Sequence, residues 1–228
     1  MLVLTHLRPH LLGCANFSQF QSAYRKGHST ETALLEVPDR VYTADIRQQT
    51  VRFRDKQVTV LICLDLPTAF DTHGILFGRL QSDFGVRETP LAWLQSYLEG
   101  RTQFFKLRRH QSRVVKLEGA VPPRSVLGSL LFAVYCSSVG DIITDHGVLY
   151  NQYADDTQLH FAMSVDNATA GLSVLAACTA EVRKWYLQNG LLLNPDKLEA
   201  LVVGTASQLC RRLICIISIR RRCGSSGG

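Results

Sequence analysis

The chain has 228 residues, of which 46% are hydrophobic, so it can bury one sizeable core and a single domain is the default. Its 25 Lys and Arg residues against 19 Asp and Glu residues leave a net charge of +6, which favours anionic partners but equally serves solubility. Seven scattered cysteines, without a CxxC pair, argue against a disulfide framework or a zinc site and indicate buried thiols in a reducing compartment.

Neither a secretory signal nor a membrane span is expected. In residues 1–13 no basic residue precedes the apolar part, and Arg8-Pro9 breaks it. The longest uncharged apolar stretch, between Arg124 and Asp141, is shorter than a bilayer-spanning helix. We therefore expect an intracellular protein, cytoplasmic or nuclear and not secreted, with no membrane partner and no defined protein partner.

The first half of the chain contains a predicted helix and a predicted strand. A helix is expected from about residue 30 to residue 46, with Ser29 as its N-cap and Pro38 as a point of bending. Residues 58–66 (VTVLICLDL) form a β-branched, apolar run that predicts a buried strand. Because a charged residue closes this strand, Asp65 is the first candidate site residue.

The middle of the chain predicts helices around a basic hairpin. Apolar residues at helical spacing predict two helices within 75–98, with Gly85 and Gly100 as stop signals. Residues 101–109 and 112–120 resemble the two strands of a hairpin with a basic turn. Residues 125–143 are apolar and too long for a strand, so one buried helix is expected there. The basic residues of the hairpin raise the odds of nucleic-acid binding; they are Arg101, Lys106, Arg108, Arg109, Arg113 and Lys116.

The last third predicts a β-hairpin, a helix and a strand. Residues 146–163 alternate on both sides of Ala154-Asp155-Asp156, which predicts a hairpin with an acidic tip. Residues 169–190 predict an amphipathic helix, and a strand is expected after a turn at 194–196. The apolar stripe of that helix is expected to contain Leu172, Leu175, Ala176, Val182, Trp185 and Tyr186.

Carboxylates from Asp65 and from the pair Asp155-Asp156 converge if their strands are neighbours in one sheet. Like charges brought together are costly unless a cation lies between them. Oxygen ligands suit Mg²⁺, and two such ions would activate an attacking hydroxyl and stabilise a leaving pyrophosphate. Adjacent strand residues point to opposite faces, which ranks Asp155 above Asp156 as a ligand. The alternative is structural, with Asp65 capping the turn at Pro67 and the pair forming a polar tip.

Five stretches of the chain, in matching order, resemble the reverse transcriptases of non-LTR (LINE-type) retrotransposons, and ordered matches over residues 8–204 make chance a poor explanation. They are Gln21 to Leu34 (QSAYRKGHSTETAL), Asp65 to Asp71 (DLPTAFD, against DLSxAFD), Val121 to Phe132 (against VPQGSVLGPLLF), Tyr153 to Asp156 (YADD) and Leu193 to Glu199 (LNPDKLE, against LNPDKTE).

The resemblance implies an α+β fold, the right-hand polymerase palm, in which helices pack on one face of an antiparallel sheet. It divides the chain into a partial fingers segment (residues 1–57), a palm (58–204) and an unmatched basic, low-complexity tail (205–228). The implied partners are an RNA template, a DNA primer and deoxynucleoside triphosphates. An isolated palm with part of the fingers would be a fragment of a polymerase.

The resemblance also implies roles for individual residues. Asp65 and Asp155 would hold two Mg²⁺ ions, with Asp156 in support and the Leu66 carbonyl as a further ligand. Lys197 would be the acid that protonates pyrophosphate. Catalysis in this scheme is mostly positioning and charge stabilisation.

Substrate contacts are implied upstream of and between the carboxylates. Phe70 would be the steric gate, whose ring fills the space that a ribose 2′-hydroxyl needs. Tyr153 belongs to the substrate-binding set through its place in the YADD motif. Arg25 and Lys26 would touch the triphosphate or the template, and their alternative is a solvated turn.

The chain departs from the family pattern in the nucleotide pocket. The expected PQG sequence reads Pro122-Pro123-Arg124, which removes the glutamine that packs on the nucleotide and puts a bulky side chain where glycine allows close approach. The segment after Phe70 is two residues shorter than AFDTVDHDIL. These departures keep open a second reading, an inactive remnant with non-specific nucleic-acid binding. A metal-dependent nuclease or phosphatase using the same carboxylates ranks last.

Overall fold

The structure is a computed structural model that describes residues 2–23, 25, 27–28, 57–66, 73–116, 126–194 and 197–203. The predicted helix at 30–46 and the tail at 205–228 lie outside these residues. So do four of the predicted site residues, namely Lys26, Phe70, Pro123 and Arg124.

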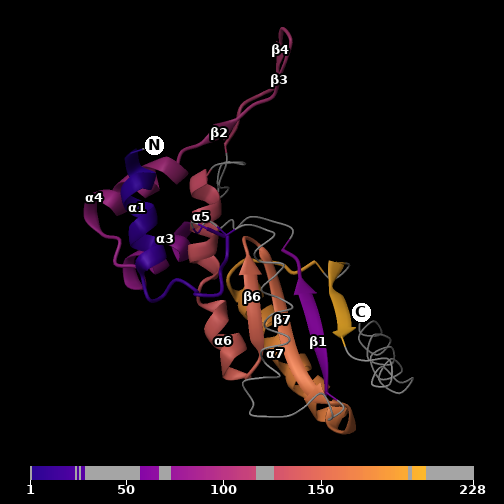
Figure 1. Ribbon diagram of the computed structural model, residues 1–228. Coiled ribbons are helices and arrows are strands. Elements are labelled where there is room, and N and C mark those ends of the chain that lie inside the picture. The colour runs from indigo at the N-terminus through magenta and orange to yellow at the C-terminus, as the bar shows by residue number, and fades with distance from the viewer. Residues whose placement is uncertain are drawn as a thin grey trace.

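A four-stranded antiparallel sheet forms the centre of the fold (Figure 1). Its strands are β1 (Gln57–Leu64), β6 (Leu149–Tyr153), β7 (Asp156–Ser164) and β8 (Glu199–Val203), in the order β6-β7-β1-β8. Val58, Val60 and Leu64 point into the core from β1, at the two-residue spacing of a strand with one buried face. The predicted strand, the acidic hairpin and the strand after the 194–196 turn are therefore confirmed, and the first two are neighbours.

Helix α7 (Ala168–Gln188) packs against β7 and covers one face of the sheet. An added Cβ at Gly171 would lie 2.8 Å from the Met163 Cβ, so the glycine allows the helix to approach the strand closely. The predicted stripe is confirmed at Leu172, Leu175, Val182 and Tyr186, which are all buried.

The stripe prediction was wrong at Ala176, whose side chain is exposed. At about 100° per residue, Ala176 lies roughly 120° around the helix from Val182 and leaves the buried face. Trp185 is only half-buried, because it lies at the edge of the same face.

The apolar stretch 125–143 was predicted as one helix but forms two, α5 (Val126–Cys136) and α6 (Val139–Asp145). Ser137 stands at the break, and its hydroxyl donates a hydrogen bond to the Val134 carbonyl at 2.9 Å, which competes with the helical backbone pattern. By length and composition the stretch Leu127–Asp145 could cross a bilayer, but 67% of it is buried within the protein, so core packing accounts for its apolar character.

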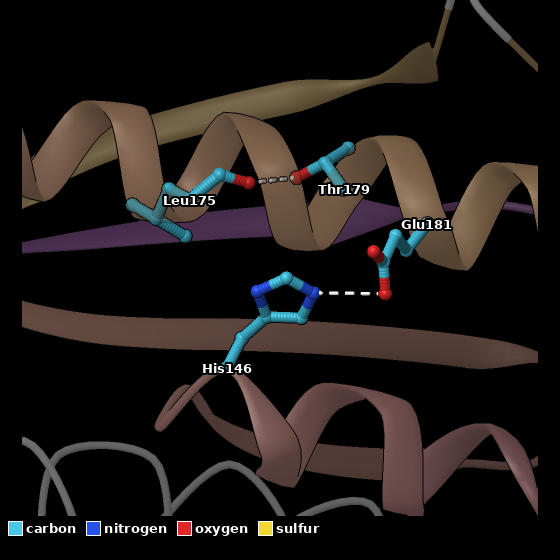
Figure 2. A network of polar contacts seen from close by, with 4 residues as sticks. All are labelled: His146, Leu175, Thr179 and Glu181. Carbon is cyan, nitrogen blue, oxygen red and sulfur yellow. Dashed lines mark hydrogen bonds and ion pairs between the residues drawn. The ribbon is translucent and has the colours of Figure 1, made fainter.

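A polar contact joins the end of α6 to α7, as Figure 2 shows. His146 follows α6, and its Nε2 lies 3.0 Å from the Glu181 Oε2. On the same helix the Thr179 hydroxyl donates to the Leu175 carbonyl at 2.8 Å. The His146–Glu181 contact attaches the end of α6 to the helix that covers the sheet.

The remaining helices form a cluster beside the sheet (Figure 1). They are α1 (Leu2–Gly13), α3 (His73–Ser82) and α4 (Glu88–Leu98), which join α5 around a shared core. The predicted pair of helices within 75–98 is confirmed, and Gly85 and Gly100 follow them with φ of 64° and 67°, a backbone geometry that favours glycine.

A narrow ribbon projects from the helical cluster, away from the sheet (Figure 1). It is made of β2 (Thr102–Gln103), β3 (Lys106–Leu107), β4 (His110–Gln111) and β5 (Val115–Lys116), with β2 paired to β5 and β3 to β4. The predicted basic hairpin is confirmed, but its turn lies at Arg108 and Arg109, two residues before the expected place, because His110 and Gln111 pair back to Leu107 and Lys106. Residues 117–120 of the predicted second strand lie outside the described residues.

Candidate functional site

The carboxylates meet at one end of the sheet because β1 and β7 are antiparallel neighbours. Their register runs from Gln57↔Ser164 to Leu64↔Thr157. One position further, Asp65 leaves β1 at the place where Asp156 begins β7. The adjacency on which the predicted site depends is therefore present.

The second acidic position lies in a tight turn between β6 and β7. Tyr153 pairs with Asp156, so Ala154 and Asp155 form a two-residue connection. Ala154 has φ of 57°, a conformation in which a residue other than glycine is strained, at a cost on the order of 1 kcal/mol or more. Such strain persists only where neighbouring groups fix the backbone.

Gln21 provides that fixation, a role that its place in the stretch QSAYRKGHSTETAL does not reveal. Its side chain is 1% exposed, its Oε1 accepts hydrogen bonds from the Ala154 N–H (3.0 Å) and the Ala23 N–H (3.1 Å), and its Nε2 donates to the Ala154 carbonyl (3.1 Å). Both backbone groups of the strained residue are thus satisfied by one buried amide. The neighbouring backbone adds two further bonds, from the Ser22 N–H to the Gln152 carbonyl and from the Gln152 N–H to the Phe20 carbonyl, each 2.9 Å.

Gln21→Ala is expected to lower the free energy of unfolding by about 2–3 kcal/mol, because it leaves the Ala154 N–H and carbonyl unsatisfied beside a buried cavity. Urea denaturation measures the change. Gln19→Ala is the matched control, since Gln19 is exposed two residues earlier, and it should stay within about 0.5 kcal/mol of wild type. Equal losses in the two variants would contradict the role given to Gln21.

The loop after α7 approaches the same end of β1. The Asn194 N–H donates to the Asp65 carbonyl at 3.0 Å, and the Lys197 Nζ lies 3.2 Å from the Asp65 Oδ2. The stretches DLPTAFD and LNPDKLE, far apart in the chain, therefore meet at Asp65. The Lys197 side chain remains largely exposed, whereas the Asp65 Oδ2 that it approaches is buried.

Negative charge accumulates at this end of the sheet. Partial burial raises the pKa of the Asp156 carboxyl, the neighbouring charges of Asp155 and Asp65 raise it further, and Lys197 opposes them. The charged form of Asp156 is therefore disfavoured in the folded chain without a cation. By linkage, this group stabilises the fold at pH values below its unfolded pKa, and that contribution is lost as pH rises through its folded pKa.

Buried hydroxyl groups form hydrogen bonds next to the acidic turn, between β6, β7 and α7. The Thr157 Oγ1 lies 3.3 Å from the Tyr186 hydroxyl and 3.4 Å from the Gln152 Nε2. Burial raises the pKa of Tyr186, which keeps its hydroxyl neutral and able to donate. Helix α7 is thus connected to the first residues of β7.

The structure describes three other predicted site residues, Leu66, Tyr153 and Arg25. Leu66 is buried directly after Asp65, and Tyr153 is half-buried at the end of β6. The Arg25 side chain contacts the segment before it: its Nη2 donates to the Ser18 carbonyl at 2.9 Å, and its guanidinium lies 5.4 Å from the centre of the Phe17 ring. Its predicted contact with the triphosphate or the template stays a prediction.

A divalent cation fits the chemistry of this arrangement. The Asp65 Oδ2 is buried and accepts no hydrogen bond from the described residues, so the Lys197 ammonium alone balances its charge there. Within the described ranges no three His, Cys, Asp or Glu side chains gather closely enough to form a complete metal-binding group. Asp65, Asp155 and Asp156 could therefore hold Mg²⁺ only together with water or substrate phosphates, which are its usual further ligands.

Solved structures similar to this chain include telomerases. The chain matches telomerase from Candida albicans in complex with a fragment of telomeric RNA, with a TM-score of 0.59 and 13% identity over 90% of this chain and 33% of that one. It matches apo telomerase from Candida tropicalis, truncated from its C-terminal domain, with a TM-score of 0.62 and 14% identity, over 90% of this chain and 41% of that one. At these identities the likeness shows the fold, and it confirms the predicted palm-like α+β architecture.

Sequence comparisons identify the family. Two Drosophila melanogaster proteins are similar, a probable RNA-directed DNA polymerase from transposon BS (28% identity) and the RNA-directed DNA polymerase from mobile element jockey (29% identity). The matches cover 78% and 71% of this chain but only 19% and 18% of those proteins. The profile described as "Reverse transcriptase (RNA-dependent DNA polymerase)" matches residues 1–215. The chain therefore belongs to the reverse transcriptase family, as its resemblance to LINE-type elements predicted.

Proposed function

We propose that this chain is the nucleotidyl-transfer part of an RNA-directed DNA polymerase, which joins deoxynucleotides to a primer 3′-hydroxyl on an RNA template. The observation that carries the proposal is the β1–β7 pairing, which brings Asp65 and Asp156 to one end of the sheet with Asp155 in the adjoining turn. The chain spans about a fifth of the length of its curated relatives, so a larger protein would supply the other polymerase parts.

The acidic residues have a defined task in this proposal. Asp65, Asp155 and Asp156 would hold Mg²⁺, which when bound polarises the attacking hydroxyl and neutralises the triphosphate. The Leu66 carbonyl, directly after Asp65, would be a further ligand. A cation would favour the charged form of Asp156, whose pKa is raised by partial burial and by the neighbouring charges of Asp155 and Asp65.

Lys197 would act at the leaving group. Its ammonium is 3.2 Å from the Asp65 carboxylate and largely exposed, so it can turn from that carboxylate toward an incoming phosphate. From there it would donate a proton to the departing pyrophosphate. Phe70 as the gate, Lys26 at the triphosphate, and Pro123 and Arg124 in the pocket remain parts of the proposal.

The intracellular location remains part of the proposal as well. Cys14, Cys63, Cys136 and Cys178 are free thiols in the structure, which supports a reducing compartment.

Primer extension tests the proposal. A labelled DNA primer on an RNA template, with all four deoxynucleotides and Mg²⁺, should be lengthened by the chain, and EDTA should abolish the products. Asp155→Asn removes one proposed ligand and should reduce incorporation on the order of 10²-fold or more. The proposed site would be contradicted if primer extension persisted in EDTA. It would also be contradicted if Asp155→Asn extended the primer at the wild-type rate.

A further inference from the structure

The ribbon of residues 102–116 is a surface without a core of its own. Two pairs of short strands hold it, from Thr102↔Lys116 to Leu107↔His110. Between them the Ser112 N–H donates to the Phe105 carbonyl, and the Phe105 N–H donates to the Ser112 hydroxyl, each at 2.8 Å. Every side chain from 102 to 116 is exposed, and Figure 1 shows the ribbon extending away from the rest of the described protein. Two-stranded ribbons are marginally stable alone, which makes this one suited to a partner.

The ribbon carries positive charge only. From residue 101 to residue 116 the sequence contains no Asp or Glu, and its basic residues are Arg101, Lys106, Arg108, Arg109, Arg113 and Lys116. Interfaces with nucleic acid are strongly positive, whereas the centres of protein interfaces are depleted in charge. Charge complementarity therefore favours a polyanion as the partner.

Two exposed aromatic rings on the ribbon favour single-stranded over double-stranded nucleic acid as its partner. Phe104 is 48% exposed and Phe105 is 72% exposed, between the basic residues Arg101 and Lys106. Consecutive residues of an extended chain point to opposite faces, so one ring is offered on each side of the ribbon. In a duplex the bases are already stacked and paired, whereas unpaired bases stack readily on aromatic side chains. Basic residues interleaved with exposed phenylalanines match single-strand binding.

The turn at the tip of the ribbon has a charged residue at a position whose backbone conformation favours glycine. Arg108 lies between the paired residues Leu107 and His110 and has φ of 54°, in the left-handed region that favours glycine. Two adjacent arginines nevertheless occupy the turn. Replacing Arg108 with glycine would relax the backbone while removing the charge, so it separates binding from the stability of the ribbon.

We propose that this ribbon is an arm that binds single-stranded nucleic acid, with Phe104 and Phe105 stacking on bases and with the arginines at its tip contacting phosphates. The arm goes beyond the catalytic site, because binding a strand requires no nucleotidyl transfer. It would bind a strand at a place separate from the carboxylates at the end of the sheet.

Fluorescence anisotropy with the full chain tests the arm. The probes are a labelled single-stranded RNA of 20 nucleotides and the same sequence as a duplex. Phe104→Ala with Phe105→Ala should weaken single-strand binding about tenfold or more and leave duplex binding within about twofold. Arg108→Gly with Arg109→Gln should weaken the binding of both probes. For the single strand, the slope of log K against log salt should become shallower by about 1.4, at about 0.7 for each of two phosphate contacts.

A charge-matched control is available on α7, where Arg183 and Lys184 are exposed. Arg183→Gln with Lys184→Gln removes the same charge and should leave single-strand affinity within about twofold. The proposed arm would be contradicted if both ribbon variants bound the single strand with wild-type affinity. It would also be contradicted if the control variant lost as much affinity as the ribbon variants. Unchanged RNA affinity with an altered sedimentation coefficient in the phenylalanine variant would also overturn it, and would make the ribbon a protein contact. Strand binding should persist in EDTA, which abolishes incorporation, so this test is separate from that of the polymerase.

Discussion

Asp65→Asn is expected to reduce deoxynucleotide incorporation on the order of 10³-fold while leaving the free energy of unfolding within about 1 kcal/mol of wild type. The amide keeps the shape of the side chain and the backbone bond from Asn194, but it removes the negative charge that would hold a cation at the end of β1. The Lys197 partner is largely exposed, and ion pairs with an exposed side chain contribute little to stability. Single-turnover primer extension and urea denaturation together measure the two effects.

Asp145→Asn is the control for this substitution, because Asp145 is an exposed carboxylate at the end of α6. It should leave both incorporation and stability unchanged. The proposed role of Asp65 would be contradicted if its variant incorporated nucleotides as fast as the control. A loss of activity accompanied by a fall of several kcal/mol in stability would instead make Asp65 a structural residue.

Gly140→Ala is expected to lower the free energy of unfolding by about 2–4 kcal/mol. An added Cβ at this buried position would lie 1.9 Å from the Tyr150 Oη and 2.7 Å from its Cζ, so the ring must move. That ring is buried, packs 4.8 Å from the Phe20 ring, and hydrogen-bonds Ser18 through its hydroxyl at 3.0 Å. Overpacking and the loss of this bond each contribute. Urea denaturation at constant pH measures the sum.

Gly78→Ala is the comparison for this substitution, because it should raise the free energy of unfolding instead of lowering it. Gly78 is exposed within α3 and has nothing within 4 Å of an added Cβ, so alanine should stabilise the helix by about 0.5–1 kcal/mol. Combining Gly140→Ala with Tyr150→Leu removes the clash, and the double variant should be less destabilised than the sum of the two single changes. Strict additivity would show that Tyr150 is not the obstacle.

Local patterns predicted the elements that carry the carboxylates. The apolar run that ends at Asp65 and the alternation around Asp155 both depend on a two-residue repeat, which a single sequence displays directly. Order along the chain and likeness to a family then predicted that the two strands are neighbours. The ranking of Asp155 above Asp156 as a metal ligand stays a prediction, although Asp156 is the residue that the register places beside Asp65.

Contacts between distant residues could not be predicted in this way. Gln21 has no periodicity that reveals its bonds to Ala154, and Arg79 gives no sign that its guanidinium lies 4.9 Å from the Tyr135 ring and 4.8 Å from the Trp185 ring. The break at Ser137 was missed because hydrophobicity continues on both sides while a local hydroxyl bond decides where the helix ends. Each of these depends on tertiary packing rather than on composition.

The bonds between Gln21 and Ala154 join positions 133 residues apart. Closing so long a loop costs entropy before any contact repays it, and folds rich in such contacts assemble slowly. We therefore expect the acidic turn to reach its final geometry late in refolding, after the sheet and helices have formed. A newly synthesised chain would then complete its proposed cation site only at the last stage of folding.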